Sequence, residues 1–108
     1  MIQILHCMVE EIQLKLDKNG RGAFVIERNE ERLAEMEIGL DAGNLTVYHT
    51  EVSDTLKGQG IGLKLLAAMV EYARLHQLKV ITLCPFVNNQ FKKSSDRYSD
   101  IWNQDWHS

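Results

Sequence analysis

The stretch that decides the fold is Val52-Ser53-Asp54-Thr55-Leu56-Lys57-Gly58-Gln59-Gly60-Ile61-Gly62, because the period of the apolar residues changes across it. Before it they alternate, as in half-buried strands, and after it they recur at the spacing of an amphipathic helix. Glycines allow positive φ angles and leave no Cβ between the backbone and a ligand. The free N–H groups of such a loop and of the first helical turn converge, and the helix dipole adds positive potential there. The stretch therefore predicts a strand-to-helix loop that binds a pyrophosphate.

The spacing of the glycines separates this loop from other phosphate-binding motifs. A P-loop carries Lys-Ser or Lys-Thr directly after its last glycine, and neither pair follows here. A dinucleotide-binding fingerprint that starts at Gly58 needs its third glycine where Leu63 stands. A glycine-rich turn without a ligand remains the alternative. It would leave unexplained why the chain places three glycines here, each costing roughly 1 kcal/mol in helical geometry.

The sequence before the loop predicts an antiparallel meander. Alternating apolar and polar residues indicate four strands, over Glu10–Asp17, Ala23–Arg28, Arg32–Leu40 and Leu45–Val52. Short turns join them, and the first contains Asn19-Gly20, a pair that tolerates the positive φ angles of tight hairpins.

The sequence after the loop predicts a helix, a buried strand and two short helical pieces. In order they cover Ile61 to about His76, Val80–Leu83, Asn88–Lys93 and Ser99–Trp102, with Pro85 closing the strand and Ser94-Ser95-Asp96 separating the last two pieces. A strand, a helix and a further strand form a right-handed crossover, so the fourth and fifth strands should be parallel neighbours. We therefore expect an α+β fold of order β-β-β-β-α-β-α, with one parallel strand added to the meander.

Composition limits the function classes. The chain has 108 residues, of which 44% are hydrophobic and 25% charged, as expected for one globular domain spanning residues 1–108. The net charge of −3 argues against nucleic-acid binding. Its apolar runs fall short of the roughly 18 residues of a membrane span, and we do not expect the first nine residues to be a signal peptide. Cys7 and Cys84 are too few for a disulfide scaffold, and no spacing of ligand residues matches a metal site, so we expect a cytoplasmic protein without metal.

Three segments together resemble the GNAT acetyltransferases. Lys57-x-x-Gly60-x-Gly62 resembles their Gln/Arg-x-x-Gly-x-Gly/Ala pyrophosphate loop, with Lys in place of Gln or Arg. His49-Thr50-Glu51-Val52 before the loop, and Cys84-Pro85-Phe86-Val87 after the fifth strand, resemble a subgroup of unusually short GNAT proteins. The resemblance extends over about residues 10–102.

The resemblance implies an N-acetyltransferase that uses acetyl-coenzyme A as co-substrate and an amine as acceptor. The cofactor-binding residues implied are Val52, Lys57, Gly58, Gln59, Gly60, Ile61, Gly62, Asn88 and Asn89. In this assignment the Val52 amide donates to the thioester carbonyl, the pantetheine arm pairs with the fourth strand, and Asn88 or Asn89 bonds the amides of the arm. Lys92 or Lys93 is a weaker candidate for a phosphate contact, since either lysine also fits a solvated helix face.

The candidate catalytic residues are Cys84, His49 and Glu51. The resemblance suggests Cys84, as a nucleophile or as a general acid for the departing thiolate, and a buried structural cysteine is the alternative. His49 and Glu51 lie two apart on one strand, so they share a face and either can accept a proton from the amine. A pair on an exposed strand, without a role in the reaction, is the alternative there.

Two rival functions stay open from the sequence. One is a non-catalytic acyl-coenzyme A binding or sensing module, and the other is an interaction domain that has kept the fold without the ligand. The acceptor is not indicated, whether a small molecule or a protein or peptide amine, and the chain fits a monomer or a homodimer equally.

Overall fold

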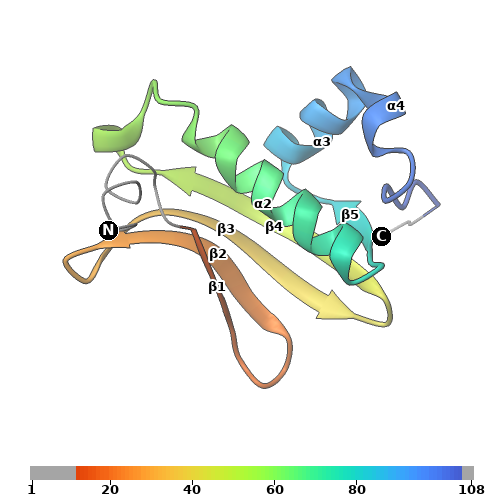
Figure 1. Ribbon diagram of the computed structural model, residues 1–108, viewed down its shortest axis with the longest axis horizontal. Helices are drawn as coiled ribbons and strands as arrows, with labels where there is room; N and C mark the ends of the chain where they lie inside the picture. The colour runs from red at the N-terminus through yellow and green to blue at the C-terminus, as the bar shows by residue number, and fades with distance from the viewer. Residues whose placement is uncertain (1–11, 106–108) are drawn as a thin grey trace, which may run out of the picture.

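The computed structural model describes residues 12–105 and contains a five-stranded mixed sheet (Figure 1). Its strands are β1 (Gln13–Leu16), β2 (Arg21–Arg28), β3 (Glu31–Asp41), β4 (Asn44–Val52) and β5 (Lys79–Thr82), in that order across the sheet. The first four pair as antiparallel neighbours, and β5 pairs in parallel with β4. The predicted meander and parallel crossover are confirmed.

The helices follow the meander and lie over the sheet in Figure 1. They are the short 3₁₀ helix η1 (Asp54–Leu56), α2 (Ile61–Leu75), α3 (Pro85–Lys93) and α4 (Ser95–Tyr98). The end of α2 was predicted correctly to within one residue, and Gln77 reverses the chain there with a φ of 57°. The sequence did not predict η1, which Ser53 caps by accepting a hydrogen bond from the Thr55 N–H through its side chain.

The chain after β5 differs from the prediction. The helix expected from Asn88 begins at Pro85, because the fixed φ of proline suits the first helical position, where no N–H is needed. The expected helix over Ser99–Trp102 is wrong: the helical turn is α4, and the segment that follows pairs with the edge of β5. The Val80 N–H donates to the Ile101 carbonyl at 2.6 Å, and the Asn103 N–H donates to the Val80 carbonyl at 2.9 Å. These bonds satisfy the Ile101 carbonyl and the Asn103 N–H, whereas the Trp102 N–H closes the last helical turn by donating to the Tyr98 carbonyl at 2.9 Å.

One apolar core lies between the sheet and the helices. We call the face of the sheet that contributes to it the inner face, and the opposite face the outer face. Fully buried side chains of the core include Met36, Ile38, Leu45, Val47, Leu65, Met69, Val80, Val87 and Phe91. Phe91 and Trp102 pack the C-terminal segment, with their rings perpendicular at 5.5 Å. Trp106, which the aromatic character of this segment suggested as a further packing residue, lies outside the described residues.

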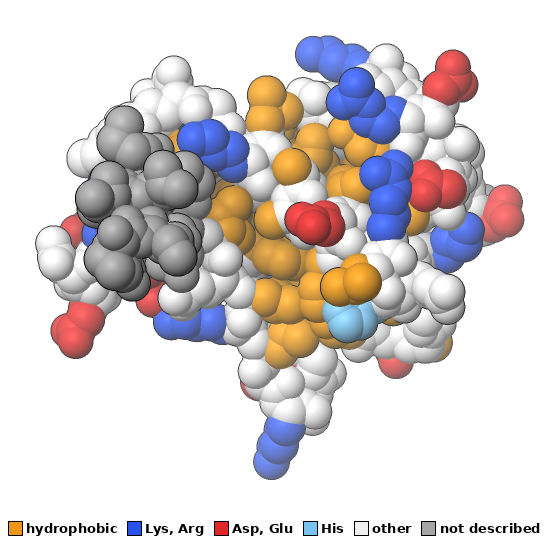
Figure 2. All heavy atoms as spheres, viewed as in Figure 1, with side chains coloured by type: hydrophobic (Ala, Val, Ile, Leu, Met, Phe, Trp, Pro, Cys, Tyr) orange, Lys and Arg blue, Asp and Glu red, His pale blue; other side chains and the backbone are white. Residues whose placement is uncertain are grey.

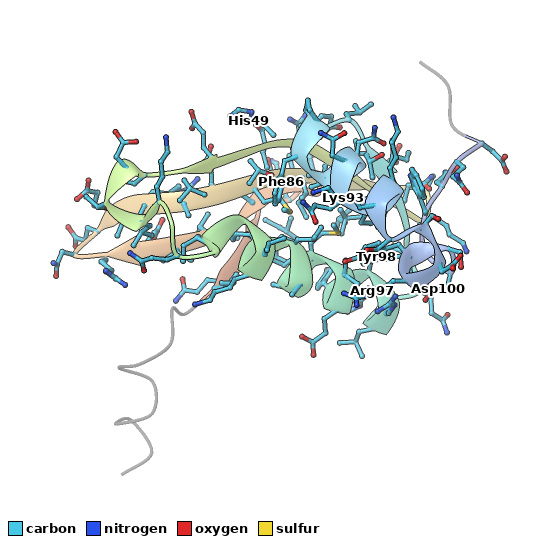
Figure 3. All side chains as sticks on the ribbon, turned by 90° about the horizontal axis from the view of Figure 1, so that it is seen from above. His49, Phe86, Lys93, Arg97, Tyr98 and Asp100 are labelled. Carbon is cyan, nitrogen blue, oxygen red and sulfur yellow. The ribbon has the colours of Figure 1, made fainter. Side chains whose placement is uncertain are left out.

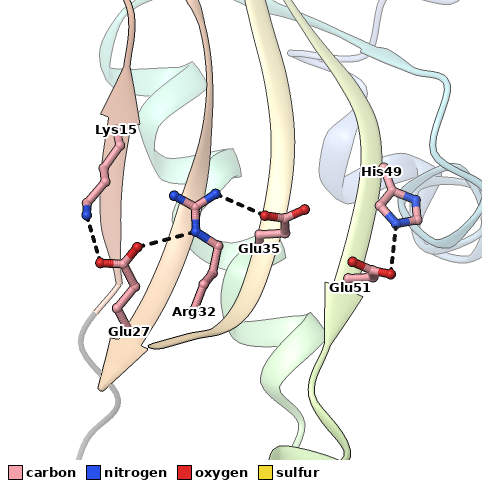
Figure 4. Close-up of polar contacts among 6 residues, drawn as sticks. All are labelled: Lys15, Glu27, Arg32, Glu35, His49 and Glu51. Atoms are coloured by element: carbon pink, nitrogen blue, oxygen red, sulfur yellow. Dashed lines mark hydrogen bonds and ion pairs between the residues drawn. The ribbon is translucent and has the colours of Figure 1, made fainter. Parts of the chain in front are cut away.

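The helix side and the outer face differ in character. Figure 2 shows hydrophobic side chains gathered along the middle of the helix side, and on α2 Leu63 and Leu75 are exposed. The outer face carries a network of ion pairs among Lys15, Glu27, Arg32 and Glu35, with the helices behind it in Figure 4. No helix among residues 12–105 is long and apolar enough to cross a membrane.

An ion pair fastens the C-terminal segment to the end of α2. The Arg74 guanidinium donates to both carboxylate oxygens of Asp100, at 3.0 and 3.2 Å, and to the Arg97 carbonyl at 2.6 Å. The hydrogen bonds from Arg74 hold the pKa of Asp100 below its ordinary 3.8. The carboxylate therefore favours the folded state above the ordinary value, and this contribution is lost as the pH falls through the lowered pKa.

We expect Arg74→Gln to return the pKa of Asp100 toward 3.8 and to flatten the acid limb of the stability profile. The reason is that the bidentate pair that favours the carboxylate is gone. Carboxyl chemical shifts followed during an acid titration measure the pKa directly. Lys57→Gln breaks the exposed Lys57–Asp54 pair, 3.0 Å long, and is the matched control. If Asp100 titrates unchanged in Arg74→Gln, the pair does not hold its charge.

Candidate functional site

The predicted glycine loop lies exposed between η1 and α2. Gly58 and Gly60 have φ angles of 83° and 70°, the left-handed region that glycine adopts without strain. A Cβ built on either glycine would meet nothing within 4 Å. These two glycines are therefore needed for the path of the backbone, and the packing of the protein itself does not require them.

The loop ends in an open helix N-terminus. Gly60 is the N-cap of α2 and offers no side-chain cap, and the first turn carries no acidic residue. The first hydrogen bond into the helix runs from the Lys64 N–H to the Gly60 carbonyl. The amides of Ile61, Gly62 and Leu63 precede it and have no acceptor within the helix. Free amides at the positive end of a helix dipole are the kind of groups that anions bind.

The N-termini of α2 and α3 lie side by side at this point. A Cβ built on Gly62 would lie 3.1 Å from Cζ of Phe86, the second residue of α3. Gly62 is thus needed for a close approach between helices, a different reason from that for Gly60. In the sequence, Phe86 stands out only as part of Cys84-Pro85-Phe86-Val87. Lys57 is the charged residue of the loop, and its Nζ atom pairs with the Asp54 carboxylate at 3.0 Å.

A β-bulge in β4 sets the geometry next to the loop. Glu37 lies opposite His49 while the next residue, Ile38, lies opposite Val47, so Tyr48 is an extra residue in β4. Just before the bulge the pairing with β5 stops. The last register pair is Val47 with Thr82, and the Val47 carbonyl then accepts from the N–H groups of both Leu83 and Cys84, at 3.1 and 2.9 Å.

Beyond the bulge, β4 continues to Val52 with one edge unpaired by β5. The Ser53 N–H donates to the Leu33 carbonyl at 2.7 Å, so the main chain of Ser53 faces β3. Main-chain polar groups of successive strand residues point alternately to the two sides of the strand. Those of Thr50 and Val52 therefore point to the side that β5 has left. They offer N–H and C=O groups to an extended ligand.

The bulge also decides which side chains share a face. After two consecutive outward residues, Tyr48 and His49, the alternation resumes with Thr50 inward and Glu51 outward. His49 and Glu51 share the outer face as predicted, with Nε2 and Oε2 3.7 Å apart (Figure 4). Both are exposed, at 53% and 72% of their side-chain surface. Figure 3 shows the His49 side chain pointing away from the helices.

Cys84 lies on the other side of the sheet. It is the N-cap of α3, 2% exposed, and its Sγ lies 3.4 Å from the Thr50 hydroxyl. The structure therefore does not bring Cys84 together with His49 and Glu51, because the sheet separates them. Thr50 is the residue that sequence reasoning missed. The sequence carried no local signal for it, because the bulge that turns Thr50 inward is defined by how β4 pairs with β3.

The two asparagines proposed for the cofactor arm differ in their surroundings. The Oδ1 atom of Asn88 accepts from the Thr82 hydroxyl at 2.8 Å, and this bond fixes the amide between β5 and α3 with its Nδ2 group left to donate. Asn89 is exposed, as are Lys92 and Lys93. Asn88 is therefore the better placed of the two to hold a ligand in one orientation.

Two further features bear on the chemistry. Among residues 12–105, no group of three or more His, Cys, Asp or Glu side chains is gathered as a metal site. An open hollow of about 450 Å³ lies at the end of β4, where its lining includes Arg32, Glu35, Glu51 and Val52. The hollow therefore adjoins Glu51, one of the predicted proton acceptors.

Comparisons with known proteins bear on the family and the fold of the chain. A family described as GCN5-related N-acetyl-transferase matches residues 23–101. The chain is similar to a GCN5-like protein from Staphylococcus aureus, assigned as an N-acetyltransferase and solved by NMR, with 38% identity, a TM-score of 0.63, and coverage of 84% of this chain and 87% of that one. The crystal structure of ribosomal-protein-alanine N-acetyltransferase from Brucella melitensis biovar Abortus 2308 shares the fold at 18% identity and a TM-score of 0.57, covering 85% of this chain and 68% of that one. No curated protein sequence matched.

Proposed function

The chain belongs to the GCN5-related N-acetyltransferase family, and we propose that it acetylates an amine at the unpaired edge of β4, with acetyl-coenzyme A as the donor. The observation that carries the proposal is the backbone around Gly60. Gly60 has a positive φ, and the space beside its Cα is open. A side chain at this position would fill the space that the proposal gives to the ligand. Loop amides and the dipole of α2 suit the pyrophosphate of the donor, and the residues involved are those predicted, Lys57 to Gly62.

The unpaired edge of β4 suits the pantetheine arm. Thr50 and Val52 present main-chain donors and acceptors to the side where β5 is missing, so an arm with amide groups can pair there as another strand would. The Val52 N–H remains our candidate donor to the thioester carbonyl. A fixed main-chain donor at that oxygen stabilises the charge that develops during attack. Asn88, fixed by Thr82, donates to the arm from the side of α3.

The acceptor amine approaches from the outer face of the sheet in this proposal. The inner face at this point is filled by the core and by α3, whereas His49 and Glu51 are exposed on the outer face. In this arrangement Glu51 or His49 takes a proton from the attacking nitrogen, directly or through water. The hollow that Glu51 lines gives an amine a path to this edge of the sheet.

In the same proposal, the thiol of Cys84 protonates the departing coenzyme A thiolate. Aminolysis of a thioester removes a proton from nitrogen and returns one to sulfur. The separation of Cys84 from the His49–Glu51 pair by the sheet matches this division, with the base on the outer face and the acid on the inner. We therefore propose the thiol of Cys84 as general acid rather than as nucleophile. The reducing cytoplasm, where we expect the protein, would keep it as a thiol.

Binding and turnover are tested separately. Coenzyme A at 100 times its Kd is expected to stabilise the folded protein by about 2.7 kcal/mol, which a thermal melt detects as a shift of several degrees. Incubation with acetyl-coenzyme A and a panel of amines, followed by free-thiol detection, measures turnover. Stabilisation without thiol release for any amine would favour the alternative, a non-catalytic acyl-coenzyme A sensor. Absence of stabilisation would remove the cofactor assignment.

A further inference from the structure

We infer that Thr50 is a positioning residue for Cys84: its hydroxyl holds the thiol in place and stabilises the thiolate that remains after proton donation. The inference rests on the proposed function, since it gives Thr50 a role in the same acetyl transfer. The carrying observation is the 3.4 Å contact between Thr50 Oγ1 and Cys84 Sγ, which joins β4 to the first residue before α3.

The β-bulge places Thr50 in this position. In a regular strand without the bulge, alternation from Val47 would point Tyr48 outward, His49 inward and Thr50 outward. With it, Thr50 faces inward and its main-chain groups lie on the edge that β5 has left. One residue therefore presents its backbone to the proposed cofactor arm and its hydroxyl to the thiol. A bulge interrupts the hydrogen-bond ladder, and here it brings a hydroxyl to the buried sulfur.

The chemistry of the pair suits proton donation. A hydroxyl both donates and accepts, so Thr50 can accept from the S–H before transfer and donate to the sulfur afterwards. Cys84 is buried, at 2% exposure, and burial disfavours a charged thiolate unless a donor compensates it. Within residues 12–105, the Thr50 hydroxyl is the group that forms a hydrogen bond with Sγ. The proton that leaves Cys84 goes to the coenzyme A sulfur. The amine's proton goes to the base on the outer face and then to solvent, and Cys84 takes a proton back from solvent before the next cycle, so the reaction balances.

Two substitutions at Thr50 separate the hydroxyl from the shape of the side chain. Thr50→Val keeps the branched shape and removes the hydroxyl, and Thr50→Ser keeps the hydroxyl. We expect Thr50→Val to lower kcat about tenfold, the size of one hydrogen bond to a charged group, with the KM for acetyl-coenzyme A within about twofold. Thr50→Ser should recover most of the loss. Thr46→Val, on the outer face of the same strand, is the matched control and should match the wild type.

A readout that does not depend on turnover follows the sulfur itself. The rate of Cys84 alkylation by iodoacetamide, measured by mass spectrometry of the digested protein, is expected to fall about fivefold or more in Thr50→Val, because the thiolate loses its donor. It should recover in Thr50→Ser. The peptide that contains Cys7 serves as the internal reference for the reagent.

The outcomes separate this inference from the proposed function. Unchanged alkylation of Cys84 in Thr50→Val, or equal losses in the valine and serine variants, would overturn the role of the Thr50 hydroxyl. Unchanged turnover in a Cys84 variant would remove Cys84 from the mechanism but leave the alkylation result standing. If no acceptor amine is known, hydrolysis of acetyl-coenzyme A and the alkylation rates still test the pair.

Discussion

Gly60→Ala is expected to weaken coenzyme A binding about 100-fold, the loss of two hydrogen bonds to charged phosphate oxygens. Gly60 has a φ of 70° and open space where a Cβ would stand. In the proposed complex that space belongs to the pyrophosphate, so a methyl group both obstructs it and favours a backbone that turns the amides away. Isothermal titration calorimetry measures the change in Kd.

The chain supplies a matched control for the backbone strain. Gly43, in the turn between β3 and β4, has a φ of 79°, and a Cβ built on it also meets nothing within 4 Å. Alanine in the left-handed region costs about 1–2 kcal/mol at either position. Gly43→Ala should therefore lose similar thermal stability and keep its affinity for coenzyme A. Equal affinities in the two variants would mean that the pyrophosphate does not lie against Gly60.

Cys84→Ala is expected to lower kcat about 100-fold, at the lower end of what a general acid contributes. The Kd for acetyl-coenzyme A should change less than about threefold, because the assigned binding groups are main-chain atoms of β4 and of the loop together with the Asn88 amide, and the substitution removes none of them. Stopped-flow or steady-state release of coenzyme A measures the first quantity, and calorimetry the second.

Controls for Cys84→Ala address stability and the alternative mechanism. Alanine leaves a small cavity beside Thr50, so Cys84→Ser, which is closer in size and keeps a polar partner for the threonine, tests whether a loss is due to packing. Cys7→Ser tests for a general effect of thiol loss. An acetyl group found on Cys84 by mass spectrometry would replace the general acid with a nucleophile, and wild-type turnover in both Cys84 variants would exclude either role.

Local patterns in the sequence predicted the architecture well. The alternation of apolar residues predicted the meander, and the helical period after Ile61 predicted α2. The order strand, helix, strand predicted that β5 lies parallel beside β4. The region after β5 was predicted poorly. There, pairing of Ile101 and Asn103 with Val80 determines the conformation, and no local pattern of apolar residues reveals a partner that lies about twenty positions earlier in the sequence.

The sequence by itself determined the fold class, the glycine loop at the start of α2, and the shared face of His49 and Glu51. All three follow from conformational preferences within a few consecutive residues. The tertiary structure alone decided that Cys84 lies across the sheet from that pair and beside Thr50. The bulge at Tyr48 is defined by how β4 pairs with β3, and the Thr50–Cys84 contact joins residues 34 positions apart. Such relations exist only between segments that the tertiary structure brings together, because alternation along one strand continues unchanged until a neighbour requires the extra residue.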